Sequence, residues 1–134
     1  MKTAAETNSN LIFANDPDSD RFALAELHNG SWRVFNGNEI GALFGWWLWT
    51  QFVEQQSNDV KPSDCYMISS AVSSKILETI SKKEGFNWVE TLTGFKWMAN
   101  NAEKHTKQGK RVLFAFEEAI GFMVIPSVEW AIKC

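Results

Sequence analysis

The chain has 134 residues, of which 45% are hydrophobic and 22% are charged, and its formal net charge is −3. These values are typical of one globular domain of ordinary size and exclude a disordered chain. The basic residues form no cluster or stripe, so nucleic acid is not expected as a partner. Seven Trp and ten Phe are a heavy aromatic load for a small domain, and some of these side chains are expected to face a partner.

Membrane insertion and secretion are not expected either. The most apolar stretch, from Ile40 to Val53, is shorter than the roughly 20 residues that span a bilayer, so it predicts a buried helix. The first ten residues are polar and hold no apolar signal core. Cys65 and Cys134 form neither a C-x-x-C pair nor a zinc spacing with the two histidines. Together these features predict a cytosolic, reduced protein.

The first third of the chain predicts three strands. Leu11 to Ala14 is an apolar run that predicts a buried strand, followed by an Asp-rich loop. Phe22 to Leu27 is a second strand candidate, and Trp32 to Phe35 is a third. Asn29-Gly30 between them predicts a tight hairpin turn, because a type I′ turn needs positive φ at both central residues.

A long aromatic helix is expected next, from about Gly37 to Gln56. Asn36 and Glu39 form a variant of the capping box that marks its start. Gly41 and Gly45, four residues apart, allow another backbone or side chain to approach one face closely. A neighbouring stripe at helical spacing is expected to be apolar and buried, and its members are Ile40, Leu43, Phe44, Trp47 and Leu48.

The remainder alternates between strands and helices after a polar loop at Ser57–Ser63. The expected strands are Tyr66–Ile68, Asn87–Thr91 and Val112–Phe116. The expected helices are Ser73–Glu84, with Ile76, Leu77 and Ile80 on one face and Gly85 at its end, and Phe95–Gln108, closed by Gly109. This alternation predicts a layered α/β/α domain with a mixed, largely parallel sheet, whose ligands bind beyond the carboxyl ends of the strands.

Three carboxylates alternate in the loop after the first strand, at Asp16, Asp18 and Asp20. A tight loop with this alternation can turn all three toward one point, where they would repel one another without a cation. Hard oxygen ligands of this kind suit Mg²⁺. Arg21 beside them can make a bidentate contact to phosphate.

The Asp-rich sequence also suggests two other kinds of loop. An EF-hand starting at Asp16 would need Gly at its sixth position and Glu at its twelfth, where the chain has Arg21 and Leu27, so that interpretation is rejected. A solvated acidic turn with no ligand is the other, and the spacing alone leaves it open.

Two further segments carry polar groups at the ends of predicted strands. Thr93-Gly94 precedes a helix, and its glycine would let a ligand approach the backbone, although an ordinary strand-to-helix turn explains it as well. Glu117-Glu118 follows the last predicted strand. An ordinary exposed turn is a better explanation for Glu118 than for Glu117.

The three segments together resemble the α-D-phosphohexomutases, in particular the phosphoglucomutase/phosphopentomutase branch. Asp16-Pro17-Asp18-Ser19-Asp20-Arg21 is similar to the family's D-x-D-x-D-R loop. The resemblance implies that the three aspartates hold Mg²⁺ and that Arg21 contacts the phosphate of an active-site phosphoserine. Glu90 to Trp97 looks like the family's threonine-glycine loop, which implies that Thr93 and Gly94 approach the sugar.

The segment Phe116 to Gly121 is similar to the family's sugar-binding loop. The resemblance implies that Glu117 binds a sugar hydroxyl. Ala119 stands where many members have Ser, which removes one hydroxyl contact and puts the preferred sugar in doubt. Such a loss is expected in the branch that prefers pentose phosphates or makes sugar bisphosphates.

The resemblance also predicts the domain organisation. Residues 1–35 would be the C-terminal part of the family's second domain with its metal loop, residues 36–127 the third domain, and residues 128–134 a divergent tail. The family's phosphoserine loop and its loop for the substrate phosphate have no counterpart in this sequence. The chain is therefore expected to be a piece of a Mg²⁺-dependent sugar-phosphate mutase, moving phosphate between position 1 and position 5 or 6, and to be inactive alone.

Two alternatives to this function remain open. One is a catalytically inactive interaction module, derived from such an enzyme, that self-associates or docks through exposed aromatic faces. The other, ranked last, is a phosphatase or phosphotransferase with an aspartate nucleophile in Asp16-Pro17-Asp18, for which no further lysine or acidic loops can be assigned.

Overall fold

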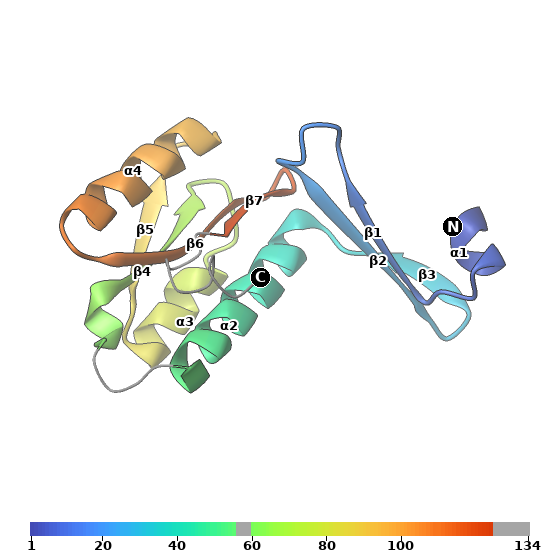
Figure 1. Cartoon of the computed structure of the whole chain (residues 1–134), viewed down its shortest axis with the longest axis horizontal. Helices are drawn as coiled ribbons and strands as arrows, with labels where there is room; N and C mark the ends of the chain where they lie inside the picture. The colour runs from blue at the N-terminus through green and yellow to red at the C-terminus, as the bar shows by residue number, and fades with distance from the viewer. Residues whose placement is uncertain (56–59, 125–134) are drawn as a thin grey trace.

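The structure is a computed structural model that describes residues 1–55 and 60–124 (Figure 1). The elements in chain order are α1 (Lys2–Glu6), β1 (Leu11–Asn15), β2 (Phe22–His28), β3 (Ser31–Val34), α2 (Gly37–Gln55), a 3₁₀ turn (Pro62–Asp64), β4 (Cys65–Ser70), α3 (Ile76–Glu84), β5 (Asn87–Thr91), α4 (Phe95–Lys107), β6 (Arg111–Glu117) and β7 (Gly121–Val124).

The larger part of the chain is an α/β/α sandwich, which confirms the predicted fold class. Its sheet has the order β5-β4-β6-β7, with β4 parallel to both neighbours and β7 antiparallel to β6. Helices α2 and α3 cover one face of the sheet and α4 covers the other (Figure 1). Strand β7 was not predicted, because its four residues follow a turn that lacks the Asn-Gly pair typical of a tight hairpin.

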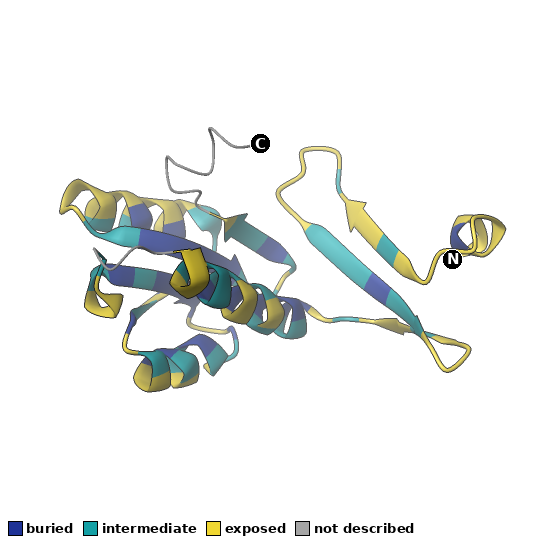
Figure 2. Ribbon diagram, turned by 60° about the horizontal axis from the view of Figure 1, so that its bottom comes forward, coloured by how far each residue is buried: buried dark blue, intermediate teal, exposed yellow. Residues whose placement is uncertain are grey.

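The first three strands form a separate antiparallel sheet in the order β1-β2-β3. The predicted hairpin turn is confirmed, since φ is +49° at Asn29 and +76° at Gly30. The expectation of a buried strand at Leu11–Ala14 is wrong within this chain. Four of the five residues of β1 are exposed, and Phe13 is 63% exposed, because none of the described helices or strands packs over that strand (Figure 2).

Helix α2 begins as predicted. The Asn36 side-chain oxygen accepts the backbone N–H of Glu39 at 3.0 Å, and the Glu39 carboxylate accepts the backbone N–H of Asn36 at 2.9 Å. This reciprocal pair is the capping box that the sequence indicated.

The buried face of α2 differs from the expected one. Leu43 and Trp47 are 51% and 52% exposed, so the predicted stripe is wrong at these two positions. The face that meets the sheet carries Gly41 and Gly45, and a Cβ on Gly41 would stand 2.5 Å from the Phe116 ring. Large residues of β6 and α3 decide the face, because Phe116 fills the space at Gly41 and Leu77 fills the space at Gly45.

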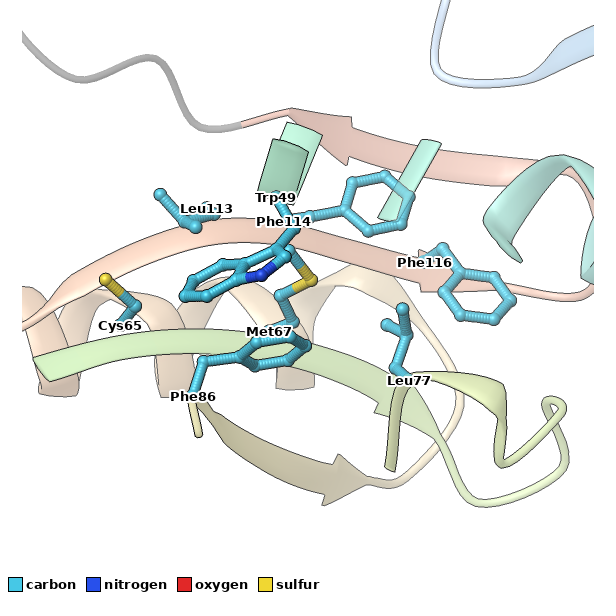
Figure 3. Close-up of a cluster of buried hydrophobic side chains, with 8 residues drawn as sticks. All are labelled: Trp49, Cys65, Met67, Leu77, Phe86, Leu113, Phe114 and Phe116. Carbon is cyan, nitrogen blue, oxygen red and sulfur yellow. The ribbon is translucent and has the colours of Figure 1, made fainter. Parts of the chain in front are cut away.

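The main core lies between the sheet and the pair α2 and α3 (Figure 3). Its buried members are Trp49, Cys65, Met67, Leu77, Phe86, Leu113, Phe114 and Phe116. A second core, under α4, consists of Ile68, Met98, Ala102, Val112 and Ala115. Side chains on both faces of the sheet are thus covered, which is why its central strands read as continuous apolar runs.

Helix α3 starts later than predicted, at Ile76 rather than Ser73. The Ser73 hydroxyl instead donates to the Glu118 carboxylate, and the Ser74 backbone N–H donates to the Asn38 side-chain oxygen. Both residues therefore make tertiary contacts before the helix begins. Gly85 ends it in the left-handed region, with φ of +86°, as expected.

Two predictions fall partly or wholly outside the described residues. The expected loop at Ser57–Ser63 includes residues 57–59, and the divergent tail comprises residues 128–134. Within the described ranges, no helix is long and apolar enough to cross a membrane.

Candidate functional site

The Asp-rich loop joins β1 to β2 and gathers its carboxylates. One oxygen from each of Asp16, Asp18 and Asp20 can be chosen so that all three lie within 4.8 Å of one another. Asp18 and Asp20 are exposed, whereas Asp16 is partly buried at the base of the loop. The alternation in sequence therefore does turn three carboxylates toward one point.

Asp16 and Arg21 hold this loop closed. The Asp16 carboxylate accepts the backbone N–H of Arg21 at 3.1 Å and its Nε–H at 2.7 Å. The backbone N–H of Ser19 donates to the Asp16 carbonyl at 3.0 Å, and the Asn15 side-chain amide donates to the Arg21 carbonyl at 3.1 Å. The loop is thus shaped by its own hydrogen bonds, with Ser19 in the left-handed region at φ of +60°.

The charges in the loop act on one another. For Asp16 the largest influence is desolvation, which opposes ionisation, but hydrogen bonds from Arg21 and Asp18 outweigh it and lower the pKa to about 2. Desolvation and the nearby charges of Asp18 and Asp16 raise the pKa of Asp20. Hydrogen bonding to Asp16 raises the pKa of Arg21. The loop therefore holds an excess of negative charge that a cation would relieve.

The donor set fits a hard divalent cation. All three groups offer carboxylate oxygen, the ligand type that Mg²⁺ prefers, and Mg²⁺ binds through few carboxylates while keeping several waters. Each carboxylate oxygen has more than one lone pair, so the bonds from Arg21 leave Asp16 able to bind a metal. Arg21 is exposed, and its Nε is also 3.7 Å from a carboxylate oxygen of Asp20.

The threonine-glycine loop and the glutamate turn meet at the carboxyl edge of the larger sheet. The backbone N–H of Gly94 donates to a carboxylate oxygen of Glu117 at 2.8 Å. Gly94 has φ of +98°, which favours glycine, and it stands directly before α4. Thr93 is exposed beside it. The structure thus brings together Thr93, Gly94 and Glu117, which come from loops far apart in sequence.

Glu118 differs from the exposed turn residue that the sequence favoured. One of its carboxylate oxygens lies 3.1 Å from both the Ser70 and the Ser73 hydroxyls. Its own backbone N–H donates to the Ser73 hydroxyl at 3.1 Å. Sequence reasoning missed Ser70 and Ser73, although their place after a buried strand at the same sheet edge was a usable signal.

The Asp-rich loop is linked to the glutamate turn through the backbone. The N–H of Phe22 donates to the Ile120 carbonyl at 2.9 Å, and Arg21 forms a β-bridge with Gly121. The Phe22 ring lies 6.4 Å from the Phe122 ring and 5.6 Å from the Phe44 ring, measured between centroids. All three predicted segments therefore belong to one continuous region of the molecule.

Comparison with protein families identifies the class. The model of the phosphoglucomutase/phosphomannomutase alpha/beta/alpha domain III matches residues 36–129. Because that match covers more than half of the chain, the chain belongs to the phosphoglucomutase/phosphomannomutase family. The predicted relationship to the α-D-phosphohexomutases is confirmed.

Curated relatives place the chain within this family. It is 57% identical over 126 residues to the phosphopentomutase of Homo sapiens, covering 93% of this chain and 21% of that protein. It is 47% identical over 129 residues to the glucose 1,6-bisphosphate synthase of Homo sapiens, covering 96% of this chain and 21% of that protein. The phosphoribomutase of Saccharomyces cerevisiae is 40% identical, again with coverage of 96% and 21%. The chain thus spans about a fifth of the length of these relatives.

Solved structures show the same fold. Aspergillus fumigatus N-acetylphosphoglucosamine mutase, in complex with GlcNAc-6P and magnesium, superposes with a TM-score of 0.63 at 21% identity, covering 91% of this chain and 24% of that one. Apo N-acetylglucosamine-phosphate mutase, described as a member of the alpha-D-phosphohexomutase superfamily, gives 0.62 at 19% identity, with coverage of 92% and 26%.

Proposed function

We propose that this chain supplies the metal loop and part of the sugar-binding surface of a Mg²⁺-dependent phosphomutase. The reaction would move phosphate between position 1 and position 5 or 6 of glucose, ribose or deoxyribose phosphates. The observation that carries this proposal is the connected geometry of the three loops. Gly94 donates to Glu117, and the same turn accepts the Phe22 N–H next to the Asp-rich loop.

Each residue has a role in this proposal. Asp16, Asp18 and Asp20 would hold Mg²⁺, which when bound offsets negative charge on a phosphoryl group. Arg21 would orient a phosphate oxygen with its guanidinium, as a planar fork of donors suits that group. The free lone pairs of the Glu117 carboxylate would accept a sugar hydroxyl.

The threonine-glycine loop would contribute the remaining sugar contacts. Thr93 is exposed and could donate or accept through its hydroxyl, and Gly94 leaves its backbone approachable because no Cβ covers it. We place residues 1–35 in the family's second domain and residues 36–127 in its third. The sequence holds no Ser-His pair, so we expect no mutase turnover from these 134 residues alone.

The test is an amide correlation NMR titration of the chain, first with Mg²⁺ and then with glucose 1,6-bisphosphate. We expect Mg²⁺ to shift the amides of Asp16 and of residues 18–21, since Pro17 has no amide proton, and the bisphosphate to shift those of residues 93–94 and 117–119. The matched control is a variant with Asp18→Asn and Asp20→Asn, which keeps the Asp16–Arg21 bonds but loses two carboxylates. Mg²⁺-induced shifts that are identical in this variant and in wild type would contradict the proposal. So would the absence of shifts from the wild-type chain.

A second function rests on a different observation. Large apolar side chains are exposed on one side of α2, and others lie on the small sheet; they are Leu43, Trp46, Trp47, Phe13 and Val34. Exposed apolar surface of this kind favours an inactive interaction module that docks or self-associates. Sedimentation velocity tests this alternative: a concentration-dependent dimer that is lost in a variant with Trp46→Gln and Trp47→Gln would support it, and a monomer at all concentrations would contradict self-association.

A further inference from the structure

The turn between β6 and β7 presents its two glutamates in opposite directions. Glu117 is the last residue of β6 and pairs with Gly121, the first residue of β7. Its side chain reaches the Gly94 N–H at the start of α4. Glu118 reaches the other way, to Ser70 at the end of β4 and to Ser73 ahead of α3. Glu117 is thus directed toward the helix α4 side of the sheet edge and Glu118 toward the α3 side, so exchanging the two side chains would require the backbone of the turn to shift by one residue.

The contacts of Glu118 form a closed hydrogen-bonded set inside the protein. Ser70 is fully buried and Ser73 is 5% exposed. Their hydroxyl oxygens are 2.6 Å apart, and each lies 3.1 Å from the same Glu118 oxygen. Two hydroxyl protons cannot fill three such contacts at once.

One assignment satisfies the set best. In it, Ser70 donates to Ser73 over the shortest of the three distances, and Ser73 donates to the Glu118 carboxylate. Ser73 also accepts the Glu118 backbone N–H, so its donor and both of its lone pairs are used. A chain of this kind, with a carboxylate at its end, fixes both the side chain and the backbone of Glu118.

The rest of the turn is confined as tightly. The Glu118 carbonyl lies against Gly37, where a Cβ would stand only 2.0 Å away. Ile120 is held at φ of +58°, a conformation that is costly for a β-branched residue. Its carbonyl accepts the Phe22 N–H that links the turn to the metal loop. A strained residue persists only where its surroundings hold it, and Glu118 supplies the anchor on the sheet side.

We infer that Glu118, anchored by Ser70 and Ser73, is a positioning residue that fixes the register of the turn so that Glu117 faces Gly94 and the sugar. This inference rests on the proposed function. The serine anchor keeps Glu118 out of the sugar surface, and the bond to Gly94 is the measurable sign of the correct register. Loss of the anchor lets the turn relax and weakens sugar binding without touching the metal loop.

The experiment follows the Gly94 amide by NMR in the 134-residue chain without ligand. The Glu117→Gln variant is the reference: it gives the chemical shift of the Gly94 amide when its charged acceptor is lost. We expect Glu118→Ala, and the double variant Ser70→Ala with Ser73→Ala, to move the Gly94 amide toward that position. Glu118→Gln keeps an oxygen acceptor for the serine hydroxyls and is expected to restore most of the wild-type shift. An unmoved Gly94 amide in both of the disruptive variants overturns the inference.

Affinities then separate positioning from general damage. We expect Glu118→Ala to weaken binding of glucose 1,6-bisphosphate about tenfold and to leave the Mg²⁺ dissociation constant within about twofold of wild type. Equal losses for both ligands would overturn the inference, because they would show a global effect on the fold. Should the disruptive variants lose amide dispersion, Ser73→Ala alone removes the hydroxyl that donates to the Glu118 carboxylate and accepts its backbone N–H, and a Gly94 amide that stays in place there also overturns the inference.

The two proposals can fail separately. Failure of the wild-type chain to bind the bisphosphate overturns the proposed function, and with it the role of Glu118 in sugar binding. The Gly94 amide of the ligand-free variants still reports whether Glu118 sets the register of the turn.

Discussion

Gly37 and the carbonyl oxygen of Glu118 are in such close contact that a Cβ built on Gly37 would stand 2.0 Å from that oxygen. Gly37 is the first residue of α2, and Glu118 lies in the turn between β6 and β7. The start of the aromatic helix and the glutamate turn are therefore packed backbone against backbone. The position of one constrains the position of the other, because neither side of the contact is a flexible side chain.

This contact predicts the effect of adding one methyl group. Gly37→Ala should lower the free energy of unfolding by about 3 kcal/mol, since the backbone of the turn must move to admit the methyl. Gly45→Ala is the matched control on the same helix, where the added Cβ meets the terminal methyl of Leu77 at 2.4 Å. That side chain can shift, and alanine gains helix propensity, so the cost should be about 1 kcal/mol or less. Urea denaturation measures both, and equal costs would contradict this account.

The Asp-rich loop predicts opposite effects for two of its residues. Asp20→Asn removes a carboxylate from the candidate metal site and should weaken Mg²⁺ binding about tenfold or more. Arg21→Gln removes a positive charge and the Nε–H bond to the Asp16 carboxylate but keeps the backbone N–H bond, so Mg²⁺ should bind as tightly as in wild type or more tightly. The same variant should weaken binding of glucose 1,6-bisphosphate, because a phosphate ligand is lost. Calorimetric titration measures these affinities, and a loss of Mg²⁺ binding in Arg21→Gln would refute the assigned roles.

Titration of His105 is expected to cause part of the pH dependence of the free energy of unfolding. Desolvation, and then the charge of Lys104, lower its pKa below the ordinary value of 6.5. Its ring stacks on Tyr66 with centroids 4.1 Å apart, and its buried Nδ1 has no hydrogen-bond partner among the residues that the structure describes. The unfolded chain therefore binds the proton more readily than the folded one, and the stabilisation is lost as the pH falls from about 6.5 through the lower pKa of the folded state.

The measurement compares wild type with His105→Phe, which keeps an aromatic ring on Tyr66 but cannot titrate. The free energy of unfolding of wild type, relative to this variant, should fall between pH 7 and pH 5. Carboxylates elsewhere titrate in both chains, so they cancel in the difference. A difference that does not change with pH would show that His105 titrates alike in both states.

The Cys65 thiol is expected to be protected from chemical labelling in the native chain. It is fully buried at the start of β4, and desolvation raises its pKa to about 11. In a Cys134→Ser background, a disulfide reagent at pH 8 should label Cys65 at least about 100-fold more slowly in the native chain than in urea, because the thiolate is the reacting form. Fast labelling of the native chain would mean that the edge of the main core opens readily.

Local features of the structure could be predicted from the sequence. The capping box of Asn36 and Glu39, the Asn29-Gly30 turn and the gathering of three carboxylates between Asp16 and Asp20 all appear as expected. Each depends on groups that are close in sequence, so chain geometry alone brings them together.

Tertiary structure decided the rest. Which face of α2 is buried depends on Phe116 and Leu77, which lie far along the chain and fill the space left by the glycines. Strand β1 is exposed because no layer formed by residues 1–55 and 60–124 covers it, which its own apolar sequence could not reveal. Glu118 is anchored by Ser73 and Ser70, which precede it in the sequence by 45 and 48 positions. Only the parallel arrangement of β4 and β6 brings the carboxyl ends of these two strands to the same sheet edge. Hydrogen bonds over such separations leave no periodic trace in sequence, so the role of Ser70, Ser73 and Glu118 emerges only when the sheet is assembled.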